Sequence, residues 1–149
     1  MKKGISLMVV VITVVVLAIL TGIIVFNSSD IIVDTTRNNL KIDIAQLEAL
    51  MNTYKIRKNG NINFEIVEFS TSGLSSFELE QFEGETITNN KIQLYVIDLY
   101  EIDAEAPNYG NLKDGEKDRY LYSIITGKVY YEKGLEHKDT TYYYVGDGE

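Results

Sequence analysis

The sequence contains no cysteine, one histidine and one proline. Without cysteine, the chain can form no disulfide, no thiolate metal site and no thiol nucleophile. A lone histidine, His137, excludes a His–His metal site and a relay of several histidines. Because Pro107 is the single proline, no proline interrupts a helix anywhere in residues 1–106.

Motifs that organise catalysis or phosphate binding are missing as well. Neither G-x-S-x-G nor S-x-x-K occurs in the sequence. Gly110 and Gly115 lack the strand–helix context and the basic residue of a phosphate-binding loop. His137 lies in the polar stretch Glu136–Asp139, which we interpret as a solvated turn. We therefore expect a protein that is not an enzyme and that holds no cofactor.

Positive charge is scarce. The chain has 14 Lys and Arg residues against 22 Asp and Glu residues, and its formal net charge at pH 7 is −8. An acidic surface repels the phosphates of nucleic acids and of anionic lipids. We therefore expect no nucleic-acid partner.

Charge is entirely absent from Ile5–Phe26, where Val, Ile and Leu dominate. As a helix this segment would be about 33 Å long, close to the ~30 Å hydrocarbon core of a bilayer. Lys2 and Lys3 precede it, while Asp30 and Asp34 follow, so the positive-inside tendency places the N-terminus in the cytoplasm. We predict a single-pass protein of the cytoplasmic membrane with its C-terminal head outside. A buried strand or core helix is the alternative.

No A-x-A-like site follows the apolar run, so cleavage by ordinary signal peptidase is not expected. The N-terminal sequence MKKGISLMVVVITVVVLAIL resembles the class III signal of type IV prepilins and pseudopilins. Together with YLYSIITGKVYY at residues 120–131, it looks most like the pilin-like proteins of Gram-positive bacteria. The resemblance implies that Lys2 and Lys3 form a basic leader, that a prepilin peptidase cuts after Gly4, and that the new N-terminus at Ile5 is methylated.

One residue departs from the family pattern. The fifth residue of most mature pilins is a glutamate that pairs with the N-terminal amine of a neighbouring subunit, but here it is Val9. A chain with Val9 lacks this device for self-polymerisation. The resemblance therefore implies a minor structural subunit of a type IV pilus-like filament, or of a secretion or competence pseudopilus, assembled with other pilin-like subunits. The alternative is a single-pass, membrane-tethered extracellular binding module.

A second helical pattern follows the apolar run. Five apolar residues recur at spacings of four and three and form one stripe of an amphipathic helix: Leu40, Ile44, Leu47, Met51 and Tyr54. We predict one nearly continuous helix from Ile5 to about Tyr54, with this stripe packed on a sheet; two separate helices are the alternative. Five polar residues are predicted to lie off the stripe: Lys41, Asp43, Gln46, Glu48 and Asn52.

Short strands and turns are predicted for the rest of the chain. Three strands are expected at Ile62–Phe69, Ile92–Leu99 and Tyr142–Val145, the second of them covered on both faces. Tyr120–Ile125 and Lys128–Glu132 flank Thr126-Gly127 and favour a hairpin. Ser75 and Glu78 fit a capping box, which predicts a short helix from Ser75 to about Phe82.

These elements predict an α+β, pilin-like fold in which a long N-terminal helix, with a transmembrane half and an amphipathic half, packs on a small antiparallel sheet. The expected organisation is a leader peptide at residues 1–4, a transmembrane or filament-core helix at 5–26, an amphipathic helix at 27–58 and an antiparallel β head at 59–149.

Two features of the head are candidates for ligand binding. Asp114, Glu116 and Asp118 alternate like the ligands of a calcium loop, but intervening lysines and the lack of a bidentate glutamate favour a solvated acidic turn. Ten of the 11 tyrosines follow Leu94. They form either a surface that binds a sugar or a protein, or the packing of a sheet, in which tyrosine is favoured. Alternation places two of them, Tyr120 and Tyr122, on one face and makes Tyr130 and Tyr143 candidates for the outer faces.

Overall fold

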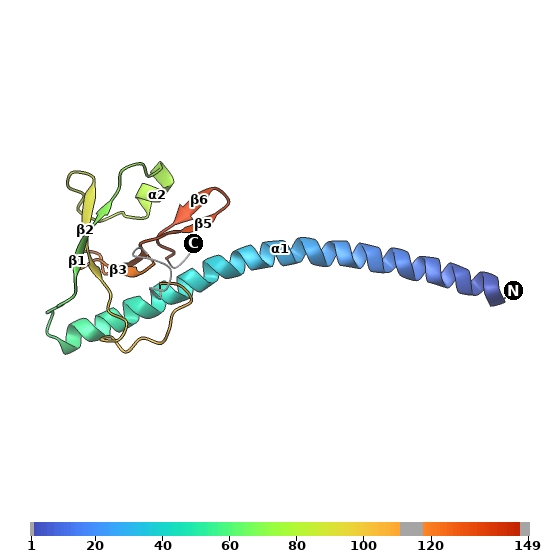
Figure 1. Cartoon of the computed structure of the whole chain (residues 1–149), viewed down its shortest axis with the longest axis horizontal. Helices are drawn as coiled ribbons and strands as arrows, with labels where there is room; N and C mark the ends of the chain where they lie inside the picture. Colours follow the sequence, from blue (N-terminus) through green and yellow to red (C-terminus); the bar gives the residue numbers. More distant parts are fainter. Residues whose placement is uncertain (1, 111–117, 147–149) are drawn as a thin grey trace. The chain divides into compact units, whose positions relative to one another are not determined.

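Helix α1, Lys2–Arg57, precedes all the strands of the chain (Figure 1). The computed structural model describes the backbone of residues 2–110 and 118–146, and the side chains of residues 8–18, 35–110 and 118–146. The chain forms two compact units, Met1–Thr36 and Arg37–Glu149, and α1 contributes to both. The described backbone of the first unit is helical throughout, and the second unit contains the strands.

Four strands of the second unit form one antiparallel sheet in the order β1-β2-β3-β4. They are β1, Ile66–Ser70; β2, Lys91–Val96; β3, Tyr120–Tyr122; and β4, Val129–Tyr131. Strands β3 and β4 pair antiparallel, and Gly127 between them has a φ of 75°. The hairpin predicted at Thr126-Gly127 is therefore confirmed, as is the antiparallel character of the sheet.

The part of α1 that belongs to the second unit covers one face of this sheet. The predicted stripe is buried, and its five side chains are 4% exposed or less: Leu40, Ile44, Leu47, Met51 and Tyr54. They share one apolar cluster with Tyr120, Tyr122 and Val129 of the sheet. The predicted packing of the helix on the sheet is therefore confirmed. Full burial of side chains of this size contributes roughly 1.5–3 kcal/mol each, so this cluster supplies the main core.

A second apolar cluster covers the opposite face, formed by Phe69, Phe82, Ile92, Leu94, Leu121 and Tyr130. The short helix α2, Ser76–Glu80, leads to Phe82, and both hydrogen bonds of the predicted capping box at Ser75 are present. Tyr130 is 1% exposed and its ring stacks on Phe82 with centroids 4.7 Å apart. Tyr130 thus lies on the face of the sheet opposite α1, for which alternation made it a candidate, but its ring is buried because that face is covered as well. Packing, rather than an exposed binding surface, accounts for this tyrosine.

Two predicted strands differ from those in the structure. Strand β2 alternates, with Ile92 and Leu94 buried and Lys91 and Gln93 exposed, so it is not covered on both faces. It ends at Val96, and a turn follows in which Asp98 accepts backbone hydrogen bonds.

The final strand lies earlier than predicted. Strand β6, Thr140–Tyr142, pairs with β5, Leu135–His137, in a separate two-stranded ribbon. Lys138 and Asp139 connect the two strands with φ values of 49° and 61°. His137 is thus a strand residue, and the turn is formed by the two residues after it.

The predicted fold class included a transmembrane half of the N-terminal helix, and the structure corrects this part of the prediction. Within the part of the chain that the structure describes, no helix has the length and apolar content needed to cross a membrane. The predicted single-pass location in the cytoplasmic membrane, and the membrane-tethered alternative that required it, are therefore not retained.

Candidate functional site

An exposed apolar surface runs along α1 in the first unit. Each apolar side chain from Met8 to Leu17 is between 46% and 67% exposed. Thr13, the polar residue among them, donates its hydroxyl to the carbonyl of Val9 at 2.7 Å, which hides the donor within the helix. We call Met8–Leu17 the apolar surface. Exposed apolar area of this kind marks a place of association.

The residues of the predicted processing signal lie at the start of α1. The backbone of Lys2, Lys3, Gly4 and Ile5 is helical, and their side chains lie outside the described residues. A peptidase needs extended backbone, so cleavage after Gly4 requires the first turn to unwind. Helix ends fray readily, and glycine is about 1 kcal/mol less favourable than alanine in a helix. Processing at Gly4 stays a prediction.

Val9 is the residue that departs from the pilin pattern, and it lies within the apolar surface. Its side chain is 56% exposed. Its neighbours on the same face, at three and four residues along the helix, are Ile12 and Thr13. The position therefore offers apolar contact and no charge.

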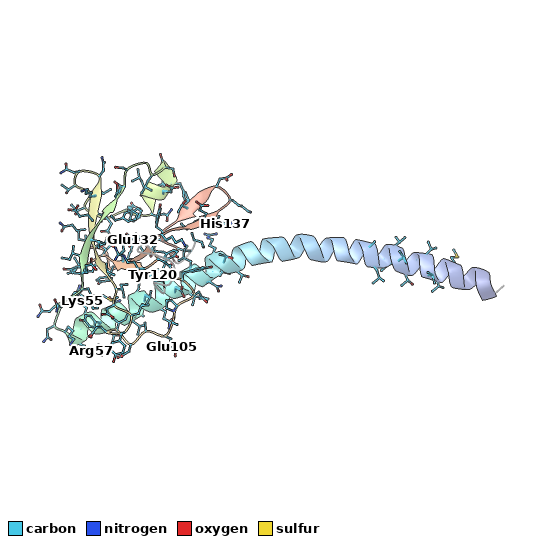
Figure 2. The ribbon with its side chains drawn as sticks, in the orientation of Figure 1. Lys55, Arg57, Glu105, Tyr120, Glu132 and His137 are labelled. Atoms are coloured by element: carbon cyan, nitrogen blue, oxygen red, sulfur yellow. The ribbon has the colours of Figure 1, made fainter. Side chains whose placement is uncertain are left out.

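A buried carboxylate on α1 is the main feature that sequence reasoning missed. Asp43, predicted to lie off the stripe, is 1% exposed. It accepts hydrogen bonds from the Tyr120 hydroxyl at 2.7 Å, from the backbone N–H and side-chain amide of Asn108 at 3.0 Å each, and from the Tyr109 N–H at 3.0 Å. Tyr120 lies between the sheet and α1 (Figure 2). Asp43 thereby ties the loop at residues 108–109 and strand β3 to the helix.

The sequence did contain a signal for this position. Asp43 follows Leu40 by three residues and precedes Leu47 by four, so it lies on the face of the helix that carries the stripe. Glu48 is similar: it accepts a hydrogen bond from the Val129 N–H at 3.1 Å, which satisfies a backbone donor of the edge strand β4. Both acidic residues had been predicted to lie off the stripe.

Two further polar side chains hold the second face together. Gln81 donates to the Thr141 carbonyl at 2.9 Å and accepts from the backbone N–H groups of Tyr143 and Tyr144 at 2.7 and 3.0 Å. Glu85 accepts hydrogen bonds from the hydroxyls of Ser123, Thr126 and Tyr130. These contacts fix the C-terminal segment and the loop after α2 on the sheet.

The buried tyrosines are suited to structure rather than to acid–base chemistry. Burial raises the pKa of the Tyr120 phenol far above its ordinary value, and the hydrogen bond to Asp43 raises it further. Burial likewise raises the pKa of Tyr130, with the charge of Glu85 adding to the effect. A phenol of raised pKa keeps its proton at neutral pH, so both residues act as hydrogen-bond donors and not as bases or nucleophiles.

The calcium candidates are only partly within the described residues. Asp114 and Glu116 lie outside them. Asp118 is 6% exposed, and it accepts hydrogen bonds from the Gly110 N–H at 3.1 Å and from the Tyr131 hydroxyl. One oxygen of its carboxylate is thus already bonded inside the fold. Calcium binding at these residues stays the alternative to the solvated acidic turn that the sequence favours.

No protein-family model, curated protein or solved structure matches this chain. Across the residues that the structure describes, no group of three or more His, Cys, Asp or Glu side chains is arranged to hold a metal ion. The polar clusters around Asp43, Gln81 and Glu85 are bonded internally. Of the features described, the apolar surface is therefore the strongest candidate for function.

Proposed function

We propose that this chain is a minor structural subunit of a type IV pilus-like filament, or of a secretion or competence pseudopilus. It joins other pilin-like subunits through the apolar surface Met8–Leu17, and its activity is assembly. The observation that supports the proposal is the exposure of that surface. Each Å² of apolar area removed from water contributes about 25 cal/mol, so packing against neighbouring helices stabilises the assembled state.

The distribution of the apolar side chains favours several neighbours over one. Successive residues of an α-helix point about 100° apart, so consecutive apolar positions face all directions around the axis. A two-helix contact would need a single apolar stripe with polar residues opposite it. Between Met8 and Leu17 the sequence has no charged residue on any side. Such a helix suits the interior of a bundle of subunits.

The assignment to a minor subunit depends on Val9. A pilin with glutamate here offers its carboxylate to the N-terminal amine of the next subunit, and Val9 cannot. This chain therefore enters a filament through partners that supply the carboxylate, with its own N-terminal ammonium group at Ile5 as the hydrogen-bond donor of that contact. In purified filaments, quantitative mass spectrometry should find the chain well below the dominant subunit. If this chain is the dominant component, the minor role is contradicted. If it is absent from the filaments of a host that makes it, its role as a filament subunit is contradicted.

Processing provides a second test. In a host with an active prepilin peptidase, intact-mass measurement should find a mature chain that begins at Ile5 and carries an N-terminal methyl group. Gly4→Leu should block the cut because the side chain hinders access to the scissile backbone. Gly22→Leu is the matched control, since it changes a glycine away from the leader, and it should leave the cut unchanged. Retention of Met1 in such a host would contradict the proposal.

A further inference from the structure

A cavity of about 470 Å³ opens in the second unit where β1 begins and β2 ends. Apolar side chains of Phe64, Val96 and Leu99 line it. Tyr100 also lines it and is 87% exposed, an unusually open position for an aromatic ring. Cavities that hold small ligands in proteins measure roughly 300–1,000 Å³, so the size suits a small molecule or one long side chain.

The uncompensated charge around this cavity is negative. Glu65 lines it, and the Glu65 carboxylate has no hydrogen bond or ion pair within the described residues. Asp98 also lines it, and its Oδ1 atom accepts the N–H groups of Tyr100 and Glu101 at 3.1 and 3.3 Å. Arg119 is the cation of the lining, and Glu132 pairs with it. A ligand therefore meets carboxylates without a free positive charge beside them.

We propose that this cavity binds an organic cation carried on an apolar stem, the chemistry of a lysine side chain or of a small alkylamine. The stem packs against Phe64, Val96 and Leu99. The ammonium group faces the Tyr100 ring, which attracts cations through its quadrupole, and the carboxylate of Glu65. A lysine of a second copy of the chain and a free amine are two sources of this one chemistry. The inference does not require the assembly function proposed above.

The test uses the full chain in a mild non-ionic detergent, which shields the apolar surface. Nα-acetyl-lysine methylamide is titrated against it by NMR, and Nα-acetyl-norleucine methylamide serves as the probe of similar shape without charge. We expect the lysine probe to bind about tenfold more tightly than the norleucine probe. Glu65→Gln and Tyr100→Ala should each weaken the lysine probe at least about threefold. Glu105→Gln is the control, because Glu105 is exposed and is not one of the residues that line the cavity.

The same variants distinguish the two sources. If a lysine of a second copy occupies the cavity, the lysine probe and Glu65→Gln will both lower the dimer fraction in sedimentation velocity. If that fraction does not change while the probe still binds, the source is a free amine. Equal binding of the lysine and norleucine probes would overturn the proposal. So would unchanged lysine binding in both Glu65→Gln and Tyr100→Ala, with circular dichroism used to show that the variants are folded.

Discussion

Replacing Asp43 with alanine is expected to destabilise the second unit strongly, because its carboxylate is the acceptor for donors from a loop and from a strand. The change leaves the Tyr120 hydroxyl and the N–H groups of Asn108 and Tyr109 without their partner. A buried donor without an acceptor costs about 1–3 kcal/mol. Tyr120 is 1% exposed and carries the full cost, whereas the loop donors can turn to water. We expect a total loss of about 2–4 kcal/mol, most of it from the Tyr120 hydroxyl.

The matched control is Glu105→Ala. The side chain of Glu105 is exposed, so its removal should cost less than about 0.5 kcal/mol. Asp43→Asn should give an intermediate loss, because it keeps one acceptor oxygen but turns an amide donor toward other donors. Urea unfolding of the full chain can be followed by tyrosine fluorescence, since the chain has 11 tyrosines and no tryptophan. If Asp43→Ala costs no more than Glu105→Ala, the carboxylate does not hold the loop and strand to the helix.

Three further predictions follow from the same core. Leu47→Ala should cost about 2–5 kcal/mol in urea unfolding, and Ile42→Ala, whose parent side chain is 58% exposed, much less. The pKa of Tyr120 is raised by burial, so its stabilising contribution is complete below the ordinary tyrosine pKa of about 10. Above that pH the contribution of Tyr120 to the free energy of unfolding falls by about 1.4 kcal/mol per pH unit, until the pH reaches the raised pKa of the folded state. Tyr120→Phe should flatten this alkaline decline. Gly110→Ala places a Cβ 2.5 Å from the Tyr120 ring at a φ of 73° and should lower the melting temperature clearly. Gly127→Ala, at a φ of 75° with no atom within 4 Å, carries only the backbone strain of about 1 kcal/mol.

Local periodicity explains what could be predicted from the sequence. The stripe from Leu40 to Tyr54 follows the helical repeat, and Thr126-Gly127 combines a glycine with strand-forming flanks. Both patterns depend on a few neighbouring residues, so no knowledge of the rest of the fold is needed. The capping box at Ser75 is local in the same way.

The remaining features depend on residues far apart in the chain. Tyr130 is buried because Phe82, more than forty residues earlier, stacks on it. Asp43 is buried because donors from residues 108–109 and from Tyr120 reach it, and an acidic residue by itself indicates solvent. The polar stretch Glu136–Asp139 did indicate a turn, but Lys138 and Asp139 adopt positive φ without glycine, so the sequence did not show that the turn is two residues long and that His137 belongs to a strand. The transmembrane prediction relied on the composition of one run, and among the residues that the structure describes no helix is long and apolar enough to cross a membrane.

Association through the apolar surface is tested most directly by photo-cross-linking in cells that make the filaments. A photoreactive residue, benzoylphenylalanine, is placed in separate variants at Val10, Val11 and Ile12, which point in different directions around the helix. A fourth variant carries it at Ser72, an exposed residue of the second unit. The proposed assembly predicts cross-links from all three helix positions to the apolar helices of other pilin-like subunits, identified by mass spectrometry, and none to those helices from Ser72. An absence of protein cross-links from Val10, Val11 and Ile12 in such cells would contradict it.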